Sequence, residues 1–168
     1  ATSPLIDTGS RRIALIGGPN HLDMVRRRKH GYLEALRENH LSIDRTLVVC
    51  DKIDFDVARR ATIVLLQRED RPDAILAFND IITYAAFDAI KEMNLRIPED
   101  VAIIGFTDGD NAAFVTPSLS AIMDQAHIQG NKACGLLMRS INGDRCIYKE
   151  VVPMILKIRE SSEKNQSK

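Results

Sequence analysis

The chain has 168 residues, of which 45% are hydrophobic and 27% are charged, a composition typical of one soluble globular domain. Positive and negative residues number 23 each, which excludes the broad basic surface that proteins use to bind nucleic acid phosphates. No apolar run approaches the roughly 20 residues that a membrane-spanning helix needs, and the first residues lack the basic and then apolar order of a secretory signal.

The chain up to Gly105 alternates short apolar runs with helical periodicity. This is the pattern of βαβ units that build a mainly parallel sheet. Pro72 and Pro98 precede two of the apolar runs, at points where a helix cannot continue. The sequence therefore predicts an α/β fold, a Rossmann-like parallel sheet flanked by helices. The expected strands are residues 13–16, 46–49, 74–77 and 101–105, and the expected helices have apolar stripes at Val25, Tyr32, Leu33 and Leu36, at Val57, Ala61, Val64 and Leu65, and at Ile82, Ala86, Ala89, Ile90 and Met93.

The pattern changes after Pro117. Residues 120–123 predict a short extended segment, residues 128–141 a helix closed by Asn142-Gly143, and residues 151–158 a last strand. Residues 160–168 contain no apolar side chain that could anchor them, so we expect this end to be disordered.

The spacing of chemically reactive residues argues against a cofactor, a metal ion and an enzymatic site. Gly17-Gly18-Pro19 follows the first expected strand but lacks the G-x-G-x-x-G spacing of dinucleotide sites. Residues 108–111 lack the glycine and the distal glutamate of a calcium loop, so they predict a turn. The four histidines show no zinc-ligand spacing, and no serine lies in a G-x-S-x-G turn. We expect no cofactor, no metal ion and no catalytic residue.

Three cysteines bear on the compartment. Cys50, Cys134 and Cys146 are odd in number and widely spaced, which suits neither a disulfide framework nor a metal site. A reducing environment is the simpler interpretation, and it favours the cytoplasm.

The one dense basic run, residues 26–29, sets one arginine apart from its neighbours. Arg28 lies three residues after Val25 and four before Tyr32, on the apolar stripe of its helix, whereas Arg26 and Arg27 face solvent. An inward arginine needs a partner. Two interpretations stay open: a fork that binds ligand hydroxyls or a carboxylate, or a structural ion pair with an acidic residue.

The most informative segment runs from Ile97 to Asp108 and is followed by Thr116-Pro117-Ser118-Leu119. It combines a buried strand with a polar exit at the carboxyl end, where open α/β sheets bind ligands. Together with residues 9–19, 28–32, 77–80, 130–143 and 156–161, in this order and spacing, it resembles the effector-binding part of lactose-repressor-type (LacI/GalR family) transcription regulators. The closing Arg159-Glu160-Ser161 favours regulators over the periplasmic sugar receptors of the same fold.

The resemblance implies one lobe of a type I periplasmic-binding-protein-like fold, with an extra crossover helix from the other lobe. Residues 1–119 would form the C-terminal subdomain, 120–146 a crossover strand and helix of the other subdomain, 147–160 a return strand to the C-terminal subdomain, and 161–168 a disordered tail. The bulk of the first subdomain would lie upstream of Ala1, which leaves the apolar face of helix 128–141 without its usual partner. We expect this helix to pack against a second copy of the chain or to be swapped between copies.

The resemblance also implies a ligand site at the carboxyl edge of the sheet. Arg28 and Asn79 match positions that bind the ligand; for Asn79, the alternative interpretation is a cap of the helix that follows. Phe106 lies beside the same edge and is expected either to stack on a sugar ring or to form part of the wall. Asp80 is expected to cap the helix that follows.

Two positions depart from the family pattern. The family usually has an acidic residue where this chain has Thr107, with Asp108 directly after it, and it often has Gln where this chain has Asp124. A carboxylate accepts two sugar hydroxyls at once, which a threonine hydroxyl cannot do. Asp124 either replaces the lost carboxylate or lies at a hinge, and all three residues are candidate ligand contacts.

The implied function is binding of a small polar, sugar-like effector by a transcription regulator. In such regulators, effector binding changes how a homodimer presents its helix-turn-helix heads, so DNA contact would come only from upstream residues absent from this chain. No membrane partner is expected. The alternatives are a periplasmic solute (sugar) binding protein of the same fold and, from another class, an α/β enzyme.

Overall fold

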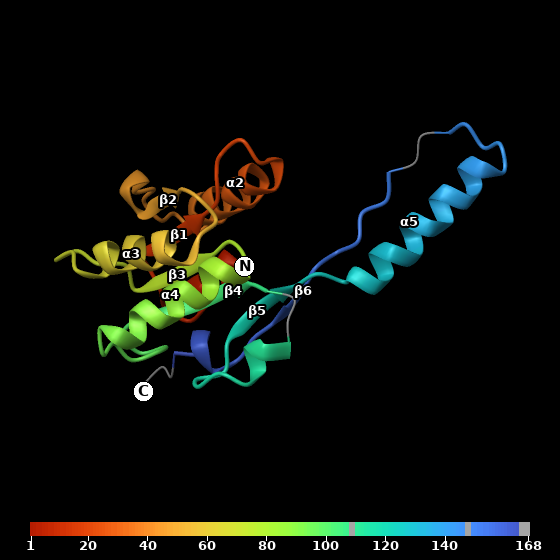
Figure 1. Cartoon of the computed structure of the whole chain (residues 1–168). Helices are drawn as coiled ribbons and strands as arrows, with labels where there is room; N and C mark the ends of the chain where they lie inside the picture. The colour runs from red at the N-terminus through yellow and green to blue at the C-terminus, as the bar shows by residue number, and fades with distance from the viewer. Residues whose placement is uncertain (108–109, 147–148, 165–168) are drawn as a thin grey trace.

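The computed structural model describes residues 1–107, 110–146 and 149–164, and it contains a six-stranded sheet (Figure 1). The strand order is β2-β1-β3-β4-β5-β6, in which β1 to β5 pair in parallel and β6 pairs antiparallel with β5. The strands are β1 (Ile13–Gly17), β2 (Val48–Cys50), β3 (Ala74–Ala77), β4 (Ala102–Phe106), β5 (Ser120–Met123) and β6 (Ile155–Lys157). The Rossmann-like α/β fold predicted from the sequence is confirmed.

Helices cover both faces of the sheet. On one face α1 and α2 pack through Leu5, Tyr32 and Leu36, and on the other α3 and α4 pack through Leu65 and Ile82. Strands β1 and β3 are buried along their whole length because both of their faces are covered. The helices are α1 (Thr2–Asp7), α2 (Asp23–Glu38), α3 (Phe55–Leu66), α4 (Asp80–Glu92) and α5 (Ala126–Ile141), and 3-10 turns lie at Arg45–Leu47, Asp110–Ala113 and Glu160–Ser162.

Local chemistry fixes the start of α4 and its distance from the sheet. The Asn79 side chain accepts a hydrogen bond of 3.0 Å from the Ile82 backbone N–H, so Asn79 and not Asp80 caps the helix. Gly105 of β4 lies against α4 so closely that an added Cβ would stand 2.2 Å from Thr83 Cγ2. The missing side chain at Gly105 allows α4 to lie directly on β4.

Helix α1 was not predicted from the sequence. It buries Thr2, Leu5 and Ile6, and the chain then reverses at Gly9, whose φ of +99° suits glycine. The Ser10 backbone N–H donates to the Leu5 carbonyl oxygen over 2.9 Å. A helix this short carries too few apolar positions to show a periodicity, because its stability comes from tertiary packing.

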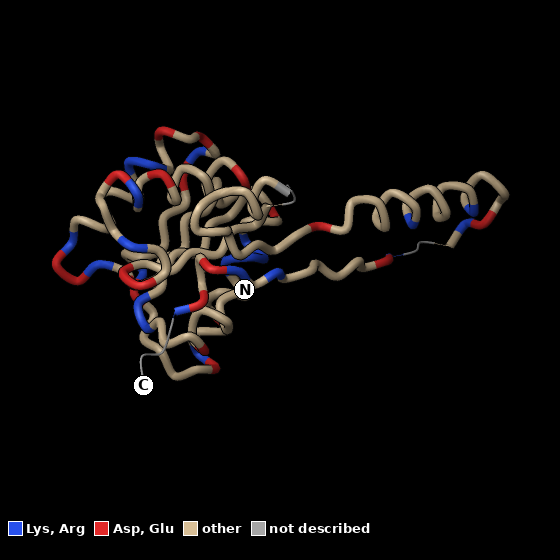
Figure 2. The backbone as a smooth tube through the Cα atoms, turned by 90° about the horizontal axis from the view of Figure 1, so that it is seen from below, with Lys and Arg blue, Asp and Glu red and all other residues tan. Residues whose placement is uncertain are grey.

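The crossover segment differs from the expectation in one respect. Strand β5 pairs with β4, with Ser120 opposite Ile104 and Ile122 opposite Phe106, so it belongs to the same sheet and not to another subdomain. Helix α5 is different, because it extends away from the sheet and none of its residues is buried (Figure 1). Figure 2 shows few charged residues along this helix, in contrast to the mixed charges around the sheet.

The end of the chain also differs from the expectation. Strand β6 covers three residues and not the expected 151–158. Ser161 and Ser162 are buried, and the Ser161 hydroxyl accepts from the Ser120 backbone N–H (2.8 Å) and donates to the Ile103 carbonyl oxygen (2.7 Å). Disorder from residue 160 is therefore wrong for residues 160–164, because hydroxyl groups anchor a segment that lacks apolar side chains. Residues 165–168 lie outside the described residues.

Candidate functional site

Five of the six candidate site residues line one cavity of about 160 Å³ at the carboxyl edge of the sheet. This edge is where α/β sheets of this kind bind ligands. Asn79 follows β3, Thr107 follows β4 and Asp124 follows β5, whereas Arg28 extends from α2. The sixth candidate, Asp108, lies outside the described residues. The lining residues are Met24, Arg28, Asn79, Asp80, Phe106, Thr107, Ile122 and Asp124.

Arg28 is held between two aromatic rings. Its guanidinium carbon lies 3.8 Å from the centroid of the Phe106 ring and 4.8 Å from that of Phe78, within cation–π range. One terminal nitrogen, Nη1, donates to the Phe78 carbonyl oxygen. Burial lowers the pKa of Arg28 below its usual value, and the negative charge of Asp124 opposes this effect. The group stays a cation because the ordinary pKa of arginine is so high.

The structural ion pair that the sequence left open for Arg28 is not formed within the described residues. Arg28 has no carboxylate within 4.0 Å there, and its Nε and Nη2 groups find no acceptor among these residues. Among the described residues, the guanidinium therefore keeps unpaired donors at the cavity, in a geometry suited to two acceptor oxygens.

Asn79 caps α4 and also lines the cavity. Its side-chain oxygen caps α4, and its amide nitrogen finds no acceptor in the described part of the chain. Its neighbour Asp80 lies in the first turn of α4, and the Asp80 Oδ1 atom is buried without a hydrogen-bond partner among the described residues. A buried unpaired acceptor costs free energy unless a donor reaches it, which makes Asp80 a second polar group available to a ligand.

Thr107 and Asp124, the two described positions that depart from the family pattern, follow the neighbouring strands β4 and β5. Thr107 is buried, and its backbone N–H donates to the Ile122 carbonyl oxygen over 3.1 Å. Asp124 is exposed at the point where the chain leaves β5 for α5, and its charge acts on Arg28. The cavity therefore combines one cation, one carboxamide and two carboxylates, a set that suits a neutral ligand rich in hydroxyl groups.

The sequence missed three members of this cavity. Met24 lies one turn before Arg28 on α2, Ile122 ends the buried part of β5, and Asp80 was assigned to helix capping. The available signal for Asp80 was its place directly after Asn79, since a helix has only one N-cap residue. A larger cavity of about 530 Å³ lies elsewhere on the domain and contains none of the candidate residues.

A family model described as "Periplasmic binding protein-like domain" matches residues 2–162 of the chain. The chain belongs to this family. Within the described residues of this periplasmic binding protein-like domain, no helix is long and apolar enough to cross a membrane.

Named relatives of the domain are transcription regulators, which confirms the resemblance seen in the sequence. The HTH-type transcriptional regulator CelR of Thermobifida fusca is 34% identical over 144 residues, which cover 86% of this chain and 42% of the relative. The solved structure of the transcriptional regulator CelR-cellobiose complex superimposes with a TM-score of 0.88 at 33% identity, over 96% of this chain and 50% of that chain. The structure of a LacI-family regulatory protein from Chloroflexus aggregans gives a TM-score of 0.88 at 34% identity, over 94% of this chain and 57% of that chain.

The chain spans about half the length, or less, of the curated relatives that it matches. The range matched by the family model, residues 2–162, contains all the side chains that line the cavity.

Proposed function

We propose that this periplasmic binding protein-like domain is the effector-binding lobe of a LacI-type transcription regulator, and that its effector is a small, polar, sugar-like molecule. The observation that carries the proposal is Arg28, fixed between Phe78 and Phe106 with unpaired donors at the cavity. The named relatives are regulators, and this favours a regulator over a solute receptor or an enzyme.

Three polar groups of the cavity, those of Arg28, Asn79 and Asp124, have a defined role in this proposal. Arg28 donates to ligand oxygens, and the Asn79 amide nitrogen donates to another. Asp124 accepts ligand hydroxyls, the task that an acid at the Thr107 position performs in the family, and Phe106 orients Arg28 and forms part of the wall. Asp108 remains a proposed contact on its place in the sequence alone.

The cavity is smaller than the roughly 300–1000 Å³ of ordinary ligand pockets, so it supplies one wall of a site. In our proposal, residues outside this chain supply the facing wall, and the effector binds the closed cleft better than the open one. Only this difference in affinity shifts the population that binds DNA. DNA contact belongs to residues outside this chain, the regulator acts as a homodimer, and its compartment is the cytoplasm.

The experiment is calorimetric titration of the full-length protein with neutral mono- and disaccharides, cellobiose included because a relative was solved with it. For the sugar that binds, Arg28→Ala should weaken affinity at least about tenfold, or about 1.4 kcal/mol. Arg27→Ala is the matched control, because Arg27 is exposed and pairs with Asp23. Equal affinities for both variants would remove Arg28 from the site, and no binding by any sugar would reject this class of effector.

A further inference from the structure

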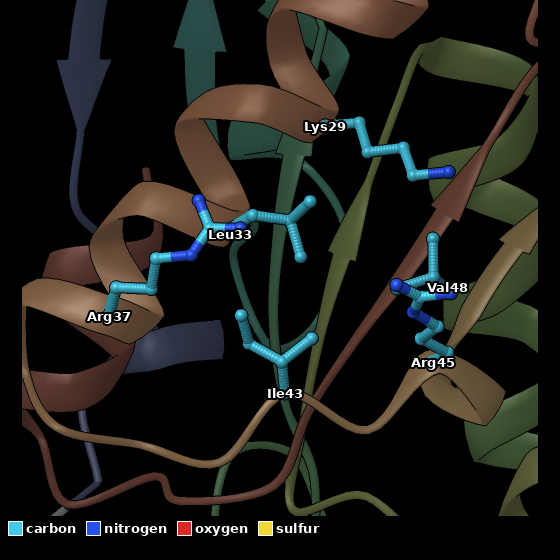
Figure 3. Close-up of a pocket in the computed structure, with 6 residues that line it drawn as sticks. All are labelled: Lys29, Leu33, Arg37, Ile43, Arg45 and Val48. Carbon is cyan, nitrogen blue, oxygen red and sulfur yellow. The ribbon is translucent and has the colours of Figure 1, made fainter.

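The larger cavity, of about 530 Å³, lies between the part of α2 from Lys29 to Arg37 and the segment that leads into the edge strand β2. It is separate from the effector cavity, although Lys29 follows Arg28 directly in α2. Its volume is within the range of pockets that enclose small molecules. The lining residues are Lys29, Leu33, Arg37, Ile43, Arg45 and Val48 (Figure 3).

Three of these six side chains are cationic and none is acidic. Figure 3 shows Lys29 and Arg37 extending from α2, while Arg45 lies beside Val48 on the other side of the cavity. Cations around one space repel each other and raise the local potential, which an anion would lower.

These three cations lack carboxylate partners in the part of the chain that the structure describes. Within the described residues, Lys29, Arg37 and Arg45 form no ion pair. Other basic residues do: Arg12 pairs with Asp44 and Asp70, Arg59 with Asp88 and Glu92, Arg68 with Asp70, and Arg96 with Asp100. Asp44, which directly precedes Arg45, is engaged by Arg12 and by Thr46, and Glu38, which directly follows Arg37, forms no ion pair with it within the described residues.

The floor of the cavity is apolar. Leu33, Ile43 and Val48 are half-buried and pack at the margin of the core beneath α1 and α2. Strand β2 is half-buried along its length, whereas its neighbour β1 is fully buried. The end of the sheet at β2 therefore offers apolar surface beside the cations, and an apolar group placed there would be removed from water.

We propose that this cavity binds a small organic phosphate whose phosphate group lies among Lys29, Arg37 and Arg45 and whose apolar body lies on Leu33, Ile43 and Val48. Arginine forks match phosphate oxygens, and three cations balance a dianion better than a single carboxylate. The site does not depend on the proposed function, since none of its residues lines the effector cavity.

The experiment is titration of the ¹⁵N-labelled chain, followed by amide chemical shifts, with phenyl phosphate, inorganic phosphate and phenol at one ionic strength. Phenyl phosphate should give saturable shifts within residues 29–48 and bind at least about threefold more tightly than inorganic phosphate, because only it covers the apolar floor. Phenol should not bind. Absence of saturable shifts up to about 10 mM phenyl phosphate would overturn the proposal. If inorganic phosphate bound as tightly as phenyl phosphate, the proposed contact between the apolar body and the floor would be wrong. If phenol bound as tightly, the proposed phosphate contact with the three cations would be wrong.

Variants separate this site from general charge attraction. Arg37→Gln and Arg45→Gln should each weaken phenyl phosphate at least about fivefold, since each removes a charge-assisted hydrogen bond. Both side chains are exposed and form no ion pair among the described residues, so neither change threatens the fold.

The control is Arg60→Gln. Arg60 is an exposed arginine of α3 on the opposite face of the sheet, so this variant should leave the affinity for phenyl phosphate unchanged. Arg28→Ala should also leave it unchanged, which keeps this test independent of the effector site. An equal loss in Arg60→Gln would reduce the effect to net charge and contradict the proposal.

Discussion

The guanidinium carbon of Arg28 lies 3.8 Å from the centroid of the Phe106 ring, so the end of β4 orients the cation that α2 carries into the cavity. A freely rotating arginine would lose side-chain entropy when it bound a ligand, whereas a stacked one has lost part of it already. We therefore expect Phe106 to affect the affinity for the proposed effector through Arg28, even if the Phe106 ring does not contact the effector.

Phe106→Leu should therefore weaken the effector about fivefold, which corresponds to a cation–π contribution of about 1 kcal/mol. Calorimetric titration with the sugar found for the parent protein measures the change. Phe114→Leu is the control, since Phe114 is 82% exposed and does not line the cavity. An unaltered affinity in Phe106→Leu would show that Phe78 alone holds Arg28.

Asp124→Asn tests whether this carboxylate replaces the acid that the family has at the Thr107 position. The amide keeps the shape but removes the charge, so a ligand hydroxyl loses a charge-assisted bond, and we expect about tenfold weaker binding. If Asp124 lies at a hinge without touching the effector, the variant should bind the sugar as the parent does, and the replacement idea fails.

The buried hydroxyl of Tyr32 makes the stability of the domain depend on pH in the alkaline range. Its hydroxyl donates to the Ile13 carbonyl oxygen over 2.8 Å, and burial, helped by the charge of Asp44, raises the pKa of Tyr32 to about 12. Because the folded pKa lies above the unfolded value of about 10, this contribution to stability is complete below pH about 10 and is lost as the pH rises towards about 12.

Tyr32→Phe should lower the free energy of unfolding by about 1–2 kcal/mol at neutral pH, because it leaves the Ile13 carbonyl oxygen without its donor. The variant should also lose less stability than the parent on the alkaline side. Urea denaturation at several pH values measures both effects. The matched control is Tyr84→Phe, because the Tyr84 hydroxyl is buried without a partner and its removal breaks no bond. Parallel pH curves for Tyr32→Phe and the parent would contradict the assignment.

Gly105 sets the distance between α4 and β4. Gly105→Ala should destabilise the domain by about 1–3 kcal/mol, because the new Cβ would overlap the buried Thr83 side chain. Gly31→Ala is the opposite case, since Gly31 is exposed in the middle of α2 with nothing within 4 Å of an added Cβ, and it should stabilise by about 0.5–1 kcal/mol. Thermal unfolding of the two variants checks this, and a shift of the same sign in both would count against it.

Helix α5 presents an apolar face to solvent in the isolated chain. Ile128, Leu137, Met138 and Ile141 are between 42% and 66% exposed. Burial of such side chains is worth about 1.5–3 kcal/mol each, so we expect the 168-residue chain to dimerise through α5. Light scattering should report a dimer for the parent chain and a monomer for Leu137→Asp. Gln129→Asp adds the same charge away from this face and should remain dimeric. A strictly monomeric parent chain would contradict the prediction.

Local periodicity in the sequence was sufficient to predict the parallel sheet and the inward direction of Arg28. The spacing of Arg28 from Val25 and Tyr32 predicted an inward side chain, and the family resemblance assigned this side chain to the ligand site. The structure brings Arg28 to the same cavity as Asn79 and Thr107. The parallel pairing of β1 to β4 was predicted from the alternating runs, because each βαβ unit returns the chain in the same direction along the sheet.

Long-range polar contacts could not be read from local pattern. Ser161 is anchored by Ile103 and Ser120, 58 and 41 residues away, so a segment without apolar residues is ordered by its hydroxyl groups. The same limit explains why β5 was assigned to the other subdomain, since its pairing with β4 depends on register and not on composition. The unpaired carboxylate oxygen of Asp80 likewise depends on which side chain caps α4.

The most direct measurement is a crystal structure of the full-length protein with its effector, identified by the sugar titration. The account predicts ligand oxygens within hydrogen-bond distance of the Arg28 guanidinium and the Asn79 amide, with the facing wall formed by residues outside this chain. A ligand bound elsewhere, with Arg28 and Asn79 making no contact to it, would contradict the account.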